Sequence, residues 1–167
     1  MAGDRSGNIW IGTDRKGLIR TNVNNHHEME FVQSHNTSET IGVQSLYIDD
    51  TDLLWVGTEK SGLAYYGNNI YKFATQLNGD VTAMAQDANG KIWYGTSDKG
   101  IVNDSGRVCY EGLLASHKVT AMTTTPDGSL WVGSKQNGLT RIKNGSSQFY
   151  SVARDSMKTL IDDHVND

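Results

Sequence analysis

Tryptophan recurs in this sequence at a nearly constant interval. The four tryptophans of the chain stand at positions 10, 55, 93 and 131, so the spacings are 45, 38 and 38 residues. Each lies in a similar short motif, such as Trp10-Ile11-Gly12-Thr13 and Trp93-Tyr94-Gly95-Thr96. Chance could supply one such match, whereas four matches in phase indicate an internal repeat. A period near 40 residues with strand-rich units is typical of a propeller or a similar array.

Each repeat can be interpreted as four short strands. An inner strand is expected at 43–48, 81–86 and 119–124, followed by a turn of the Asp-x-x-Gly type, in which Asp bonds its own backbone and Gly takes a positive φ. We align these turns on Asp4, Asp50, Asp87 and Asp127, with Asp52 near the usual Gly position of the second repeat. The tryptophan strand follows, and a Gly-Leu or Gly-Ile pair then opens a hairpin into a third strand. More variable fourth strands are expected at about 29–33, 70–75, 107–110 and 148–152.

The predicted fold is an all-β propeller of four four-stranded antiparallel blades. The repeats cover approximately 1–42, 43–80, 81–118 and 119–164, within one propeller segment at 1–167. A sheet of this size cannot bury both of its faces alone, so neighbouring blades must cover each other. A tryptophan buries on the order of 200 Å², so we expect the four indoles in the core between blades, with carbohydrate stacking as the alternative.

The two ends of the chain match parts of an inner strand. Val165 corresponds to the valine that opens Val81-Thr82-Ala83, and Ala2-Gly3-Asp4 corresponds to the end of such a strand. An open arc of blades would expose sheet edges, which invites association. We therefore expect either a small closed ring or a homo-oligomer formed through the open blade edges, within a ring of about eight blades.

Composition excludes several classes of function. The formal net charge is −4, which argues against a nucleic-acid partner. The single cysteine, Cys109, excludes an internal disulfide and gives no metal cluster. No run of eighteen apolar residues occurs, so we expect no membrane segment in this chain, and the N-terminus does not look like a signal peptide. We expect no cofactor.

The repeated unit resembles the two-component regulator propeller repeat. Residues 4–20, 50–66, 87–103 and 127–142 carry the motif, and the tail around Ile161 resembles a connector in which the family usually has proline. The resemblance implies a segment of the periplasmic sensor region of a bacterial hybrid two-component sensor histidine kinase. Many such sensors respond to oligosaccharides. No residues indicate kinase chemistry in this chain.

Two sets of loops are expected at one face of the propeller, where ligands commonly bind. Together they hold nine candidate ligand-binding residues: Lys16, Lys60, Asp98, Lys99, Lys135, Asn78, Asp80, His117 and Lys118. Ammonium groups would supply charge, and Asn, Asp and His would supply directional hydrogen bonds. This pattern predicts a site for an acidic or polyhydroxylated sugar. The alternative is that these hairpin tips are simply solvated and charged.

Weaker patterns favour structural explanations. Asp87-Ala88-Asn89-Gly90 differs from a calcium loop because its glycine stands at position four. His26, His27 and His35 lack the spacing of metal ligands. We expect a binding module and not an enzyme. Two alternatives remain: a propeller enzyme like the streptogramin lyases, which would need a channel histidine such as His117 or His164, or a protein-interaction scaffold.

Overall fold

The computed structural model describes residues 1–32, 42–67, 70–73, 79–103, 105–151 and 165. The chain divides into two compact units, residues 1–81 and 82–167. The described residues form sixteen β-strands and no helix. None of them therefore belongs to a helix long and apolar enough to cross a membrane.

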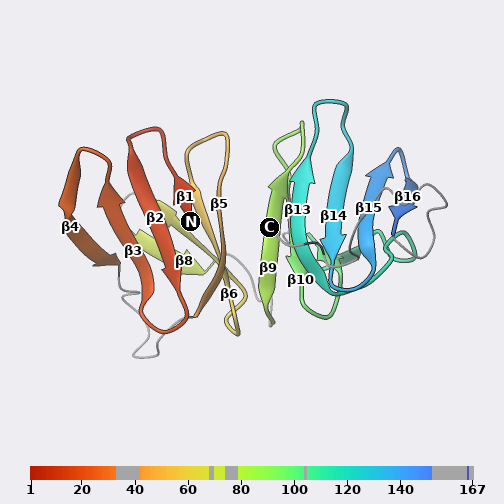
Figure 1. The fold of residues 1–167 in the computed structure, drawn as a ribbon, viewed down its shortest axis with the longest axis horizontal. Helices are drawn as coiled ribbons and strands as arrows, with labels where there is room; N and C mark the ends of the chain where they lie inside the picture. Colours follow the sequence, from red (N-terminus) through yellow and green to blue (C-terminus); the bar gives the residue numbers. More distant parts are fainter. Residues whose placement is uncertain (33–41, 68–69, 74–78, 104, 152–164, 166–167) are drawn as a thin grey trace. The chain divides into compact units, whose positions relative to one another are not determined.

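The first unit contains two four-stranded sheets (Figure 1). The first blade consists of β1 (Ala2–Gly3), β2 (Asn8–Thr13), β3 (Gly17–Asn22) and β4 (Asn25–Val32), paired in that order. The second blade consists of β5 (Val43–Ile48), β6 (Leu54–Thr58), β7 (Leu63–Gly67) and β8 (Ile70–Phe73), again in chain order. Neighbouring strands in these two sheets are antiparallel throughout.

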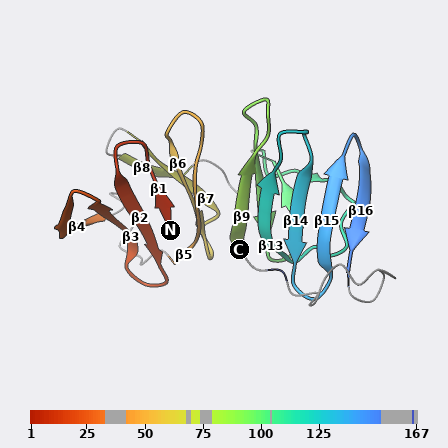
Figure 2. The ribbon, with the colours of Figure 1, turned by 45° about the horizontal axis from the view of Figure 1, so that its top comes forward.

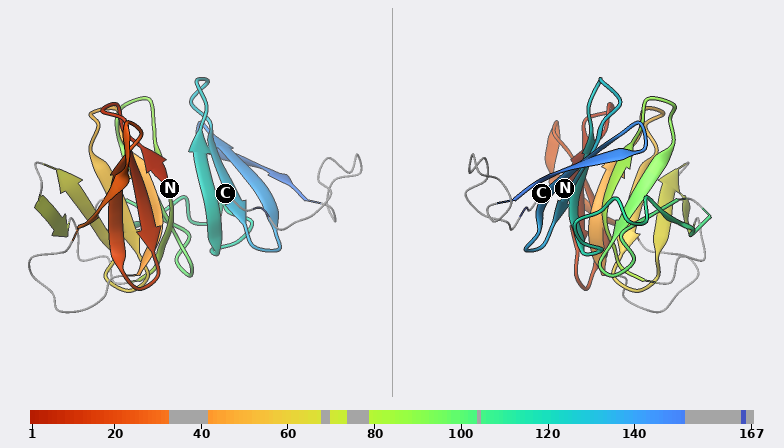
Figure 3. Two further views of the ribbon diagram at one scale, coloured as in Figure 1. Left: turned by 60° about the vertical axis from the view of Figure 1, so that its left-hand side comes forward. Right: turned by 90° about the vertical axis from the view of Figure 1, so that its right-hand side faces the viewer.

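The second unit repeats this plan (Figure 2). The third blade consists of β9 (Val81–Gln86), β10 (Ile92–Thr96), β11 (Ile101–Val102) and β12 (Val108–Cys109). The fourth consists of β13 (Val119–Thr124), β14 (Leu130–Ser134), β15 (Gly138–Lys143) and β16 (Ser146–Tyr150). In both blades, spatial order follows chain order, and the strands show the twist of propeller blades (Figure 3).

The predicted fold class is confirmed. The three expected inner strands coincide with β5, β9 and β13. The fourth strand of the first repeat begins at Asn25, earlier than expected, because β3 and β4 form a tight hairpin in which Asn22 pairs with Asn25.

The predicted first residue was wrong for two of the four turns. In every blade the first turn residue accepts a hydrogen bond from the amide three residues later, and the tryptophan follows six residues after it. These first residues are Asp4, Asp49, Asp87 and Thr125, so Asp50 and Asp127 lie one and two residues past the position assigned to them. The expectation for Asp52 holds: it takes the glycine position with φ 68°.

Each unit has an apolar core made by both of its blades. In the first unit, Trp10 and Leu18 pack with Val43, Leu54 and Val56. In the second, Trp93 and Ile101 pack with Val119, Leu130 and Val132. Trp10 and Trp93 are 4% and 9% exposed, whereas Trp55 and Trp131 are half-buried, so the expected core environment holds for two of the four indoles.

The glycine two residues after Trp10 and after Trp93 permits a close approach by the valine that begins the inner strand of the next blade. A Cβ placed on Gly12 would lie 2.4 Å from Cγ1 of Val43, and one on Gly95 would lie 2.4 Å from Cγ1 of Val119. In the fourth blade, a Cβ placed on Gly133 would lie 2.7 Å from Cγ1 of Val165, which belongs to no described strand. Any larger residue at Gly12 or Gly95 would push the two strands apart. Within each unit, the glycine therefore determines how close the tryptophan strand of one blade lies to the inner strand of the next.

Candidate functional site

The loops that follow the tryptophan strands are closed by one repeated hydrogen bond. A Thr or Ser hydroxyl donates to the carbonyl of the glycine four residues later, in the pairs Thr13–Gly17, Thr58–Gly62, Thr96–Gly100 and Ser134–Gly138. The hydroxyl oxygen of Thr96 also accepts the amide of Lys99 at 2.9 Å, and that of Thr13 accepts the amide of Lys16 at 2.9 Å. These bonds fix the backbone of the loops that carry the candidate lysines.

In the second unit, the structure brings five of the candidate residues to one end of the two sheets. The amide of Gly100 donates to the carbonyl of His117 at 2.9 Å, and the amide of Lys135 donates to the carbonyl of Lys118 at 3.2 Å. The two loops after the tryptophan strands are thus joined to the segment that enters β13. The five residues are all exposed: Asp98, Lys99, His117, Lys118 and Lys135.

This end of the second unit concentrates positive charge. Three ammonium groups, on Lys99, Lys118 and Lys135, come from three different segments joined by the backbone bonds above. Ammonium groups donate to carboxylates, sulfates and hydroxyls, while Asp98 and His117 add acceptors and a directional donor. The arrangement can therefore hold an acceptor-rich ligand that reaches several loops at once.

The first unit places its candidates less closely together. Ser61 pairs with Gly79, which brings Asp80 beside the loop of the exposed Lys60. The Nζ of Lys16 lies 5.9 Å from the ring centroid of Phe31, so this side chain packs over β4. Asn78 lies outside the described residues.

The described residues include no group of three or more His, Cys, Asp or Glu that could hold a metal ion. His35 and His164, two of the histidines considered for other roles, lie outside the described residues. Asp87 does not resemble a calcium ligand, because its carboxylate accepts the amides of Asn89 and Lys91 and the indole Nε1 of Trp93. These hydrogen bonds support a structural role for Asp87 in closing the turn.

At the opposite end of the strands, the turn aspartate binds the tryptophan of its own blade. The indole Nε1 donates to the carboxylate at 2.9 Å in Trp10–Asp4, at 2.7 Å in Trp55–Asp49 and at 3.0 Å in Trp93–Asp87. Burial acts to raise the pKa of Asp49, but hydrogen bonds from Thr51, Trp55 and two backbone amides outweigh it, so its pKa lies below the usual value. The same balance lowers the pKa of Asp4.

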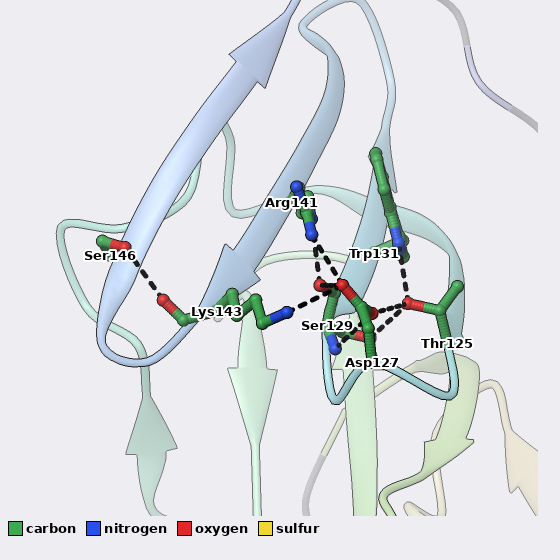
Figure 4. A network of polar contacts seen from close by, with 7 residues as sticks. All are labelled: Thr125, Asp127, Ser129, Trp131, Arg141, Lys143 and Ser146. Carbon is green, nitrogen blue, oxygen red and sulfur yellow. Dashed lines mark hydrogen bonds and ion pairs between the residues drawn. The ribbon is translucent and has the colours of Figure 1, made fainter.

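The fourth blade replaces this pair with a network around Asp127 (Figure 4). Trp131 donates to the hydroxyl of Thr125, and Thr125 donates to Asp127 at 2.6 Å. The same carboxylate accepts Arg141 at 2.7 Å and Lys143 at 2.9 Å. Hydrogen bonds from Thr125, Lys143 and Ser129 hold the pKa of Asp127 well below its usual range. Sequence reasoning missed this network, although the threonine six residues before Trp131 marks it.

Four antiparallel four-stranded sheets that repeat one motif define a β-propeller. Residues 75–98 match the family described as two component regulator propeller. This segment of the chain therefore matches one repeat of the kind that the tryptophan motifs indicated. A comparison with curated proteins finds no match.

Solved structures show the same fold. Extracellular domains of two proteins from B. thetaiotaomicron, each described as a hybrid two component system, match with TM-scores of 0.74 and 0.71, both at 21% identity. The matches cover 96% and 95% of this chain but 23% and 22% of those chains, so the chain spans about a quarter of their length. Virginiamycin B lyase from Staphylococcus aureus matches with a TM-score of 0.63 at 16% identity, over 89% of this chain and 53% of that one.

Proposed function

We propose that this chain is a ligand-sensing part of the periplasmic region of a bacterial two-component sensor, and that its ligand is an acidic or polyhydroxylated oligosaccharide. The proposal is supported by the family match and by the likeness to extracellular domains of hybrid two-component systems. It is carried by the lysine-bearing loops of the second unit.

Three features favour binding at these loops over a merely solvated surface. The backbone of Lys99, Lys118 and Lys135 is fixed by hydrogen bonds within and between loops, so the loops need little ordering when a ligand binds. The positive charges come from separate segments, which suits a ligand longer than one ring. The acceptor and donor groups of Asp98 and His117 lie in the same segments and can select among hydroxyl arrangements.

The experiment is a calorimetric titration with acidic and neutral oligosaccharides. Binding of an acidic oligosaccharide should weaken about tenfold or more in a Lys99→Ala, Lys135→Ala double variant, since each charge-assisted hydrogen bond contributes about 1.5 kcal/mol or more. The matched control is Arg107→Ala, which removes an exposed positive charge in the turn between β11 and β12, at the other end of the third blade. Equal binding by the parent and the double variant would remove these loops from the site.

We propose no catalytic role. The lyase shares the propeller fold with this chain, and a likeness at 16% identity carries no chemistry beyond the fold. A sensing role predicts that a bound oligosaccharide is recovered unchanged, which chromatography of the ligand after incubation would check.

A further inference from the structure

The second unit contains a hollow at the opposite end of the strands from the lysine loops. It has a volume of about 170 Å³ and lies among the turn after β9, the turn after β13 and the hairpin between β15 and β16. Its floor is apolar, formed by Trp93, Leu130 and Ile142, which are 9%, 5% and 3% exposed. Pockets for drug-sized molecules measure roughly 300 Å³ or more, so this hollow fits a single ring.

The rim of this pocket carries polar groups that lack partners. The side-chain amides of Asn89 and Asn144 and the hydroxyl of Tyr110 make no hydrogen bond within the described part of the chain. Amides and phenols both donate and accept, so they match ligand groups that do the same. Asp87 also lines the pocket, but its carboxylate is occupied by Trp93 and the turn amides.

Tyr110 adds a sign of functional constraint. Its φ is 57°, a conformation that is rare for a bulky residue and that persists only where the surroundings impose it. This backbone places its ring 5.1 Å from the ring of Trp93, between centroids, so that two aromatic rings line one pocket. Burial raises the pKa of Tyr110 above its ordinary value, and its neutral hydroxyl can both donate and accept.

We infer that this pocket binds a hexopyranose ring, either free or at the end of a longer chain. A pyranose has an apolar face of C–H groups, which would lie on the floor of Trp93, Leu130 and Ile142. Its hydroxyls both donate and accept, as do the groups of Asn89, Asn144 and Tyr110. This inference goes beyond the proposed function, because the pocket and the lysine loops share no residue and lie at opposite ends of the strands.

Lys143 sets the preference for charge at this site. It lines the pocket, and one N–H of its ammonium group is used by Asp127 at 2.9 Å. Asp127 also pairs with Arg141, so the three side chains together keep one net positive charge, and two N–H groups of Lys143 are not used by Asp127. The site should therefore accept a neutral ring and tolerate an anionic one.

The experiment is saturation-transfer NMR on the whole chain with methyl β-glucopyranoside, methyl β-galactopyranoside and methyl glucuronide. We expect transfer to the C–H face of at least one neutral glycoside. Asn144→Gly should weaken this binding about fivefold, as should Tyr110→Phe, since each removes one hydrogen bond of about 1 kcal/mol. Glycine accepts the φ of 50° at position 144, so that variant should keep its fold, which circular dichroism would verify.

One control separates this site from the lysine loops. Asn137→Gly removes an exposed amide at the lysine end and should leave the binding of the two neutral glycosides unchanged. A chitooligosaccharide or a longer glucan that binds through the same residues would show that the ring can be the end of a chain. The inference would be overturned if neither neutral glycoside gave a saturation-transfer signal or if only the glucuronide bound. It would also be overturned if Asn144→Gly and Tyr110→Phe both bound as tightly as the parent.

Discussion

The indole nitrogen of Trp131 donates a hydrogen bond of 3.3 Å to the hydroxyl of Thr125, where the other three blades offer a carboxylate. The carboxylate of the fourth blade has moved two residues along, to Asp127, and binds Thr125, Arg141 and Lys143. The same turn backbone is retained, because the amide of Gly128 still donates to the carbonyl of Thr125. The indole of the repeated tryptophan is therefore bound by a carboxylate in three blades and by a threonine hydroxyl in the fourth.

This exchange predicts a non-additive pair of substitutions. Thr125→Asp alone should lower the melting temperature, because it removes the donor to Asp127 and sets a second carboxylate beside it. Adding Asp127→Ser should restore stability, since the pair reproduces the Asp-x-Ser-Gly turn of the first blade at Asp4–Gly7. Thermal unfolding of both single variants and the double variant measures the coupling. Additive effects would show that the two positions do not compensate each other.

The low pKa values of the turn aspartates predict acid sensitivity. A carboxyl group with a folded pKa below its unfolded value of 3.8 stabilises the fold above that pH, and this contribution disappears as the pH falls through the folded pKa. Asp49→Asn should therefore lower the free energy of unfolding by about 1 to 2 kcal/mol at pH 7, and by much less near pH 2. Urea titrations at several pH values test this. Parallel stability curves for the parent and the variant would contradict it.

The tryptophans should differ in their contribution to stability. Trp10 is 4% exposed and its ring centroid lies 5.0 Å from that of Tyr66 of the second blade, so Trp10→Ala should cost about 3 to 5 kcal/mol. Trp131 is half-buried, stacks on Tyr150 of its own blade, and should cost clearly less when replaced by alanine. Urea denaturation compares the two, and equal losses would mean that their environments do not differ as described.

The sequence predicts the strands well because two periodic signals agree. The valine that opens β9 and the glycine turn at Gly90 both bound the strand, so its limits at Val81 and Gln86 could be predicted. The first residue of each turn was harder to predict than the limits of the strands. In the second repeat, three aspartates lie close enough to Trp55 to be the first turn residue. Asp49 is the correct one because it lies six residues before Trp55 and accepts a hydrogen bond from the indole. The spacing of six residues becomes informative only when this hydrogen bond is known.

The candidate site was predictable in part. Loop lysines are visible in sequence, and their grouping in the second unit follows from the order of the strands. The pocket near Tyr110 was not predictable, because it depends on a positive φ in a short irregular segment and on a hairpin of the next blade. No local pattern marks a tyrosine that takes such a conformation.

The contact between Gly95 and Val119 tests most directly how the blades pack. A Cβ on Gly95 would lie 2.4 Å from Cγ1 and 3.0 Å from Cβ of Val119, whereas one on Gly3 would find no atom closer than 3.9 Å. Gly95→Ala should therefore lower the free energy of unfolding by about 2 to 3 kcal/mol, and Gly3→Ala should change it by less than about 0.5 kcal/mol. In urea denaturation, Val119→Ala should recover part of the loss in a Gly95→Ala background. Equal stability of the two glycine variants, with no coupling to position 119, would contradict the packing of β10 against the inner strand β13.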